Sequence, residues 1–166
     1  MIIRKEQPQD HAAIARITAD AFAGVDHSDG TEPAIISALR DAGALALSLV
    51  AVDDDGRIAG HAAFSPVTID GREGGWFGLG PVAVRPDRQR AGIGGALIRA
   101  GLEELRRQGA GCCVVLGEPA YYRRFGFERD EALYYDGAPA AYFMRIAFVD
   151  PAPEGRVEYH PGFGAS

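Results

Sequence analysis

The sequence predicts a single α/β domain built on a mixed, mostly antiparallel sheet with helices on both faces. Three observations support this prediction. A chain of 166 residues with 47% hydrophobic content has the size and composition of one globular domain with one core. Apolar segments with strand character form hairpins first and then alternate with segments at helical spacing. A glycine-rich turn joins one strand to an amphipathic helix.

The first part of the chain predicts one strand and two helices. Residues 1–5 have the pattern of a short strand, and residues 8–22 carry apolar side chains at helical spacing. Residues 24–30 are polar and are expected to form a loop. A second helix is expected over residues 31–43, because Pro33 near its start favours a helical first turn.

The middle of the chain predicts strands joined by tight turns. Residues 45–52 have the composition of a buried strand, and residues 58–69 return as a long strand after a turn over residues 53–56. Another turn is expected at residues 70–71. The next strand, over residues 76–84, leads directly into the glycine-rich turn.

The helix after the glycine-rich turn is amphipathic. Its expected apolar face consists of Leu97, Ile98, Leu102 and Leu105. Its expected polar face consists of Arg99, Glu103, Arg106 and Arg107. The helix is expected to run to about Gln108, because glycines follow over residues 109–111.

The last part of the chain predicts short elements and a tail. Strands are expected over residues 112–116, 133–135 and 142–148, and a short helix over residues 119–125. The Pro- and Gly-rich tail is expected to pack on the same domain as an irregular cover, or to add a strand through Val157 and Tyr159. We therefore expect one domain over residues 1–149 and a packed tail over residues 150–166.

Composition and charge exclude several classes of protein. A net charge of −6 argues against a nucleic-acid partner. No apolar run approaches the roughly 20 residues that span a bilayer, and no signal peptide is recognisable, so we expect a cytoplasmic protein without a membrane partner. Cys112 and Cys113 are neighbours on a strand and point to opposite faces, so we expect buried thiols, with neither a disulfide nor a structural zinc site.

The glycine-rich turn predicts an anion site. Gly92, Gly94 and Gly95 precede a helix whose first backbone N–H groups have no partner within the helix, and its dipole favours negative charge there. The turn lacks the Gly-Lys-Ser/Thr ending of a nucleotide P-loop. It is also a poor dinucleotide fingerprint, because Leu97 stands where the third glycine belongs. A phosphorylated cofactor of another kind is expected.

Pro81 predicts an interruption in the strand before this turn. Proline has no N–H for a β-ladder, so it occurs at sheet edges, strand starts or bulges. A bulge in a central strand would splay it from its neighbour and leave backbone groups free to pair with an extended amide such as pantetheine, the arm of coenzyme A. The alternative is an ordinary edge-strand proline without a ligand.

These residues resemble the GNAT superfamily of acyl-CoA N-acyltransferases. Residues 89–94, Gln-Arg-Ala-Gly-Ile-Gly, match its Gln/Arg-x-x-Gly-x-Gly/Ala signature. Residues 79–86 are similar to the strand that precedes the signature, and residues 121–127 are similar to a later Tyr-x-x-x-Gly-Phe motif. The element order from Met1 to Phe148 is similar too. The resemblance implies acetyl-CoA as cosubstrate, no metal, and a central pair of splayed strands.

The resemblance also implies which residues hold the cofactor. The main chain of Val82, Ala83 and Val84 would bind the pantetheine arm. The signature and the start of the helix would bind the diphosphate, which implies Gln89, Arg90, Ala91, Gly92, Ile93, Gly94, Gly95 and Ala96. Guanidinium groups suit phosphate oxygens, so Arg85, Arg88 and Arg90 are candidates for the adenosine phosphates, although a solvated basic loop explains each of them equally well.

Tyr122 matches the family tyrosine near the thioester sulfur. A phenol with a reference pKa of about 10 keeps its proton at pH 7 and can donate it to a departing thiolate. The alternative is a core aromatic residue whose hydroxyl is hydrogen-bonded, and Tyr121 is expected to have that packing role.

The general base is less well defined by the sequence. Glu118 is the first choice because it follows the strand over residues 112–116, but capping of the next helix explains it equally well. Glu73 and His61 are weaker candidates, and a chain of water molecules could replace a dedicated base.

The resulting hypothesis is an N-acetyltransferase that moves an acetyl group from acetyl-CoA to a primary amine by direct attack. The alternative is a non-catalytic domain that binds or senses acyl-CoA. The acceptor, a small molecule or a peptide, is not defined by any motif. Asp26, Asp29 and Glu32 near one loop hint at a cationic acceptor, although such groups are usually only solvated. A homodimer is an expectation from the resemblance alone.

Overall fold

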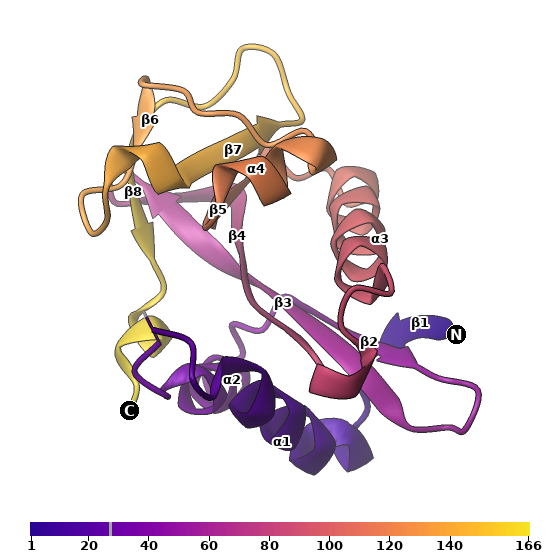
Figure 1. Cartoon of the computed structure of the whole chain (residues 1–166). Helices are drawn as coiled ribbons and strands as arrows, with labels where there is room; N and C mark the ends of the chain where they lie inside the picture. Colours follow the sequence, from indigo (N-terminus) through magenta and orange to yellow (C-terminus); the bar gives the residue numbers. More distant parts are fainter. Residues whose placement is uncertain (27) are drawn as a thin grey trace.

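The computed structural model describes residues 1–26 and 28–166 (Figure 1). Its strands are β1 (Ile2–Lys5), β2 (Leu47–Val52), β3 (Ile58–Ile69), β4 (Arg72–Val84), β5 (Cys112–Leu116), β6 (Leu133–Tyr134), β7 (Phe143–Ala147) and β8 (Gly155–Tyr159). Its α-helices are α1 (His11–Phe22), α2 (Glu32–Asp41), α3 (Ile93–Arg107) and α4 (Pro119–Tyr122). No helix among the described residues is long and apolar enough to cross a membrane.

Short 3-10 helices complete the chain. They are Pro8–Asp10, Pro86–Arg88, Arg123–Phe125, Ala140–Tyr142 and Pro161–Gly164. The loop expected over residues 24–30 includes position 27, which lies outside the described residues.

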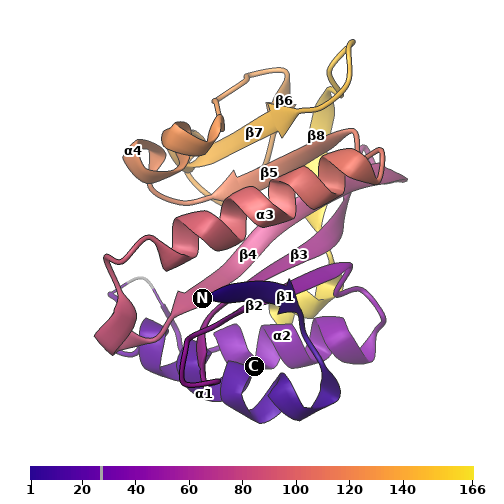
Figure 2. The same ribbon diagram turned by 90° about the vertical axis from the view of Figure 1, so that its right-hand side faces the viewer.

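The sheet is mixed and mostly antiparallel. Its strands follow the order β1-β2-β3-β4-β5-β7, and β8 pairs with both β3 and β6. The pairs β4–β5 and β6–β8 are parallel, and the other pairs are antiparallel. Helix α3 lies across one face, and α1 and α2 lie on the other side (Figures 1 and 2). The predicted fold class is therefore confirmed.

The largest core lies between α3 and the sheet. The expected apolar face of α3 is buried, and it packs against Phe64 and Leu79 of the central strands. Full burial of a Leu or Ile side chain contributes roughly 1.5–3 kcal/mol. This packing fixes the position of α3 and therefore also that of the glycine-rich turn at its start.

The starts of two elements differ most from the sequence prediction. Strand β4 begins at Arg72 and not at residue 76, because pairing of Arg72 with Ile69 closes the β3–β4 hairpin through the backbone, without apolar side chains. Helix α1 begins at His11, after a 3-10 turn. Of the two alternatives for the tail, the added strand through Val157 and Tyr159 is confirmed: it is β8, which pairs with residues 67–69 of β3.

Cys112 and Cys113 lie on opposite faces of β5. Cys113 belongs to the core beneath α3, and Cys112 belongs to a second core that includes Val157 of β8. Both are free, buried thiols. Burial raises the pKa of Cys112 to about 11 and raises the pKa of Cys113 as well, so both stay protonated at neutral pH.

Strands β4 and β5 separate at the predicted bulge. They pair only from Trp76 with Cys112 to Leu79 with Val115. On the other side of β4, Leu79 pairs with Phe64 of β3 and Val82 pairs with Ala62. Three steps along β4 therefore match two along β3, which places one extra residue at Gly80-Pro81. Since β4 has neighbours on both sides, the edge-strand explanation of Pro81 is wrong.

Candidate active site

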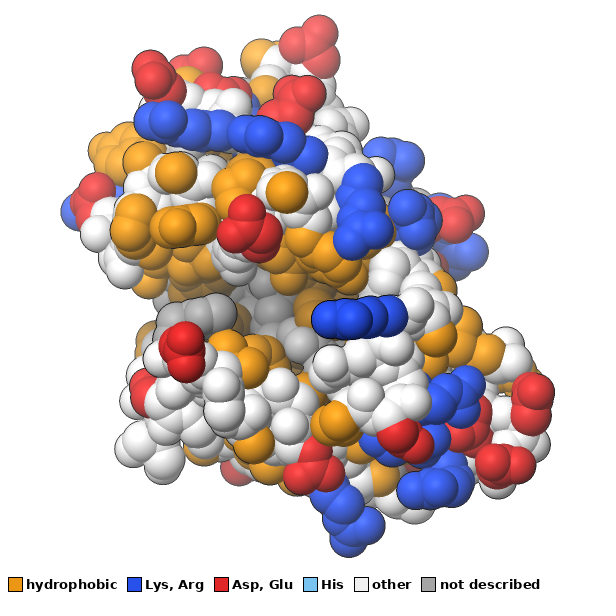
Figure 3. Space-filling view, viewed as in Figure 1, with side chains coloured by type: hydrophobic (Ala, Val, Ile, Leu, Met, Phe, Trp, Pro, Cys, Tyr) orange, Lys and Arg blue, Asp and Glu red, His pale blue; other side chains and the backbone are white. Residues whose placement is uncertain are grey.

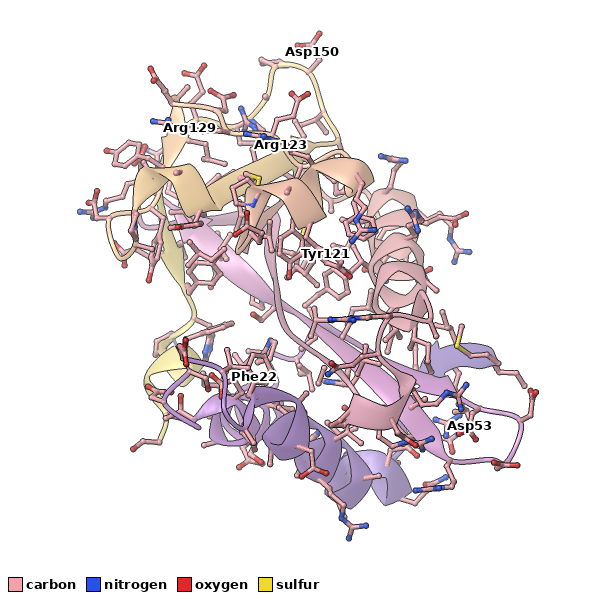
Figure 4. All side chains as sticks on the ribbon, viewed as in Figure 1. Phe22, Asp53, Tyr121, Arg123, Arg129 and Asp150 are labelled. Atoms are coloured by element: carbon pink, nitrogen blue, oxygen red, sulfur yellow. The ribbon has the colours of Figure 1, made fainter. Side chains whose placement is uncertain are left out.

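A cavity of about 710 Å³ opens where β4 and β5 separate. The space-filling view shows the hollow between the half of the molecule that carries α4 and the half that carries α1 (Figure 3). Phe22 of α1 and Tyr121 of α4 lie on opposite sides of this space (Figure 4). The lining residues come from α1, β4, the glycine-rich turn, α3 and α4 with its 3-10 extension: Ala21, Phe22, Val82, Val84, Gln89, Arg90, Gly92, Ile93, Gly94, Gly95, Arg99, Tyr121, Tyr122, Arg124 and Phe125.

The backbone of β4 presents polar groups to this cavity. The N–H of Arg85 donates to Ala59 O of β3 at 2.8 Å. Because strand residues alternate in direction, Ala83 also faces β3, and the N–H and C=O groups of Val82 and Val84 face the side that β5 has left. Val82 and Val84 line the cavity as expected, and Ala83 does not.

Gln89 fixes one of these backbone groups. Its side-chain amide donates to Val84 O at 3.1 Å. The carbonyl is therefore partly satisfied within the chain, and the groups left for a ligand are those of Val82 and the N–H of Val84. Gln89 lines the cavity, but its amide is engaged with the strand.

The start of α3 forms the anion end of the cavity. Gly92 is the N-cap with φ +82°, and the helix has no side-chain cap hydrogen bond there. The N–H groups of the first turn, on Ile93, Gly94 and Gly95, have no carbonyl partner within the helix. The N–H of Ala96 is not available to a ligand, because it donates to Gly92 O at 3.0 Å. Ala91 is exposed and lies outside the lining.

Two glycines keep the space between α3 and α4 open. A Cβ at Gly94 would lie 3.1 Å from the Tyr121 hydroxyl oxygen. A Cβ at Gly95 would lie 3.2 Å from Arg99 Nη1 and 3.4 Å from the Phe125 ring. A larger residue at either position would crowd these side chains, which explains why this chain has glycine at positions 94 and 95.

Tyr122 lies in the wall of the cavity at the end of α4. Its ring packs edge-on against Tyr121, with centroids 5.0 Å apart, and against Phe127, with centroids 5.9 Å apart. A Cβ at Gly117 would lie 2.3 Å from the Tyr122 ring, so this glycine allows the ring to lie against the backbone. Burial, with a smaller effect of Tyr121, raises the pKa of Tyr122 to about 12. Its phenol is fully protonated at neutral pH.

The carboxylate and imidazole candidates for a base lie outside the cavity lining. Glu118 is the N-cap of α4; its carbonyl accepts from the N–H groups of Tyr121 and Tyr122 at 3.1 Å, while its side chain is exposed and makes no capping hydrogen bond. His61 is fully buried beside Ser48. Glu73 is exposed near the far end of β4.

A metal site is also absent from the part of the chain that the structure describes. No group of three or more His, Cys, Asp and Glu side chains there is arranged to hold an ion.

The arginines at the site differ from those that the sequence singled out. Arg85 and Arg88 lie 3.3 and 3.2 Å from Asp53, which holds them against the β2–β3 turn. Arg90 lines the cavity as expected, with φ +66°. Arg99 and Arg124 line it too, and sequence reasoning missed them. The spacing of Arg99, four residues after Gly95 on one helix face, was the available signal.

The chain matches known proteins along nearly its whole length. The family model described as acetyltransferase (GNAT) domain matches residues 2–129. The N-acetyltransferase YhbS of Escherichia coli K12 is 36% identical over 169 residues, covering 98% of each chain. The crystal structure of YhbS in complex with CoA has a TM-score of 0.90 at 34% identity, covering 98% of this chain and 91% of that one. A GNAT family acetyltransferase from Brucella melitensis, in complex with acetyl-CoA, has a TM-score of 0.87 at 52% identity, covering 98% and 97%.

Proposed function

This chain belongs to the GNAT family of acetyltransferases, and on that premise we propose that it transfers an acetyl group from acetyl-CoA to a primary amine by direct attack. The observation that carries the proposal is the cavity between the splayed strands, which has free helix amides at one end and Tyr122 in its wall. An amine acceptor follows from the family.

The polar groups of the cavity fit the donor. A diphosphate suits the unpartnered N–H groups at the start of α3, where the helix dipole also favours an anion. An extended pantetheine arm carries amides that match the C=O of Val82 and the N–H of Val84. When bound, acetyl-CoA supplies an activated acyl group as a thioester.

Tyr122 is proposed as the general acid. During the transfer, a C–N bond forms between the amine and the acetyl carbon, and the C–S bond of the thioester breaks. The attacking nitrogen loses one proton, and the leaving sulfur gains one. With a pKa of about 12, the Tyr122 hydroxyl holds its proton at pH 7 and can donate it to the sulfur. The N–H of Val82, which faces the cavity, is proposed to stabilise the negative charge that develops on the carbonyl oxygen.

Glu118 remains the carboxylate proposed to accept the proton from the amine. Its side chain is exposed next to α4 and does not line the cavity, so a water molecule would have to connect it with the amine. Glu118→Gln tests this step: we expect kcat/KM to fall while the Kd for CoA stays unchanged. An unchanged kcat/KM would assign the step to water alone.

Tyr122→Phe tests the proposed function. We expect release of free CoA thiol, with acetyl-CoA and a panel of primary amines, to slow by about 10²–10⁴-fold while the Kd for CoA stays within twofold. Tyr134→Phe, which removes the hydroxyl of an exposed residue outside the cavity lining, should leave both quantities unchanged. Turnover of Tyr122→Phe within threefold of the parent protein would show that Tyr122 is not the acid.

A further inference from the structure

Two arginines from different elements converge on one aromatic ring in the cavity wall. The guanidinium carbon of Arg99, on α3, lies 4.8 Å from the centroid of the Phe125 ring. That of Arg124 lies 5.8 Å from the same centroid and 4.4 Å from the centroid of Tyr121. Both arginines line the cavity. The aromatic rings therefore hold two positive charges in the wall of one cavity.

These two charges have no carboxylate partner in the part of the chain that the structure describes. The arginine ion pairs there involve Arg4, Arg40, Arg85, Arg88, Arg107, Arg129, Arg145 and Arg156. Arg124 uses only its Nε, which donates to Tyr121 O at 3.2 Å. Two guanidinium groups without a carboxylate in the wall of one cavity suit an anion that accepts hydrogen bonds from both.

The pair lies beside the start of α3 and not on it. Arg99 is four residues after Gly95, and therefore one helical turn along the same face. Gly95 also leaves the room that Arg99 occupies, since a Cβ there would lie 3.2 Å from Arg99 Nη1. The anion that suits these guanidinium groups is thus a second phosphate, separate from a diphosphate on the helix amides.

We propose that Arg99 and Arg124 form a subsite for the 3′-phosphate of the adenosine ribose of coenzyme A. This inference rests on the proposed function, since it takes the donor to lie in the cavity with its diphosphate at the start of α3. A phosphate monoester carries two charges at neutral pH and presents three acceptor oxygens, which planar guanidinium forks match well. The subsite makes the enzyme select coenzyme A over dephospho-coenzyme A, which lacks only this group.

The test is the ratio of two dissociation constants, measured by calorimetry for CoA and for dephospho-CoA. The parent protein should bind CoA at least about 30-fold more tightly. Arg99→Gln and Arg124→Gln should each weaken CoA binding about tenfold and leave dephospho-CoA binding unchanged. Arg124→Lys, which keeps the charge but not the fork, should fall between the parent and Arg124→Gln.

The matched control is Arg106→Gln. Arg106 also belongs to α3 and also lies near an aromatic ring, 5.0 Å from the Phe148 centroid, but it does not line the cavity. This variant should keep the parent ratio. Equal weakening of both nucleotides by the Arg99 and Arg124 variants, or a parent ratio near one, would overturn the subsite. A protein that selects CoA over dephospho-CoA but transfers no acetyl group would support the subsite and contradict the proposed function. A protein that transfers the acetyl group without this selection would support the proposed function and contradict the subsite.

Discussion

His61 shows how a single buried residue acquires a defined protonation state. Its Nε2 lies 2.7 Å from Ser48 Oγ, and Ser48 Oγ is also hydrogen-bonded to Glu6. Burial raises the pKa of Glu6, but hydrogen bonds from Arg40 and Ser48 lower it more, so Glu6 is ionised at neutral pH and can only accept. Ser48 therefore donates to Glu6 and accepts from the Nε2–H of His61. Nδ1 keeps a lone pair without a partner among the described residues.

The protonation state of His61 predicts a loss of stability at mildly acidic pH. Burial lowers the pKa of His61 to about 4; Glu6 raises it and Arg40 lowers it by smaller amounts. The unfolded chain takes up a proton near pH 6.5, and the folded protein does not until about pH 4. We therefore expect the free energy of unfolding contributed by this group to fall by about 3 kcal/mol between pH 7 and pH 4, measured by urea unfolding.

His61→Gln separates this group from the other titrating residues. A glutamine amide can donate to Ser48 from nearly the same position as Nε2, but it does not titrate. The variant should therefore lose less stability than the parent protein over the same pH interval, whatever its stability at pH 7. Parallel pH dependences would mean that His61 is not the group responsible.

At the scale of elements, the contact of α3 with β3 depends on a glycine in the middle of a helix. Gly101 lies against Phe64, and a Cβ at Gly101 would lie 2.2 Å from the Phe64 ring. In an exposed helix, Gly→Ala would stabilise by about 1 kcal/mol. Here the sign is reversed: we expect Gly101→Ala to lower the free energy of unfolding by about 2 kcal/mol, measured by chemical denaturation, because a closely packed core has no room for the methyl group.

A double-mutant cycle checks the cause of that effect. Phe64→Leu alone should destabilise by leaving a cavity. Combined with Gly101→Ala, the smaller side chain makes room for the methyl group, so the double variant should be more stable than the sum of the two single effects predicts. If the two changes in the free energy of unfolding simply add, the contact with Phe64 is not the cause of the Gly101→Ala effect.

Elements that depend on local patterns were predictable from the sequence. Residues 58–69 and 112–116 form strands with the expected bounds, and Pro81 marks the bulge that opens the cavity. Local patterns also indicate the glycine turn, since the backbone there needs an αL conformation at Gly92. The polar, glycine-rich start of β4 at Arg72 gave no such signal, because its pairing comes from the hairpin backbone.

Contacts between distant segments were not predictable in the same way. Arg85 and Arg88 are paired with Asp53, which lies more than thirty residues earlier in the chain. Arg99 and Arg124 meet on Phe125 only because α3 packs against the 3-10 helix Arg123–Phe125. Charge and spacing along the sequence do not distinguish a paired arginine from one that is free to hold a phosphate.

At the scale of the whole molecule, the C-terminal segment links the two halves that enclose the cavity. β8 pairs with β6 and with β3, and the chain then continues to the 3-10 helix Pro161–Gly164 beside α2 (Figure 1). Tyr159 covers Gly78 of β4, while Phe163 packs with Leu39 of α2. We propose that this segment is part of the same domain and holds the half of the molecule that carries α1 and α2 against the sheet.

This role predicts that stability and donor binding respond differently to changes in the segment. No residue after Phe125 lines the cavity in the part of the chain that the structure describes. Phe163→Ala should therefore lower the free energy of unfolding by about 1–3 kcal/mol, since the ring is only partly buried, and leave the Kd for CoA unchanged.

By linkage, CoA at about 100 times its Kd should stabilise the parent and the variant equally, by roughly 2.7 kcal/mol. Removal of only residues 165–166 should change neither quantity. A Phe163→Ala protein of parent stability would contradict the linking role, whereas a weakened Kd would show that the segment also shapes the donor site.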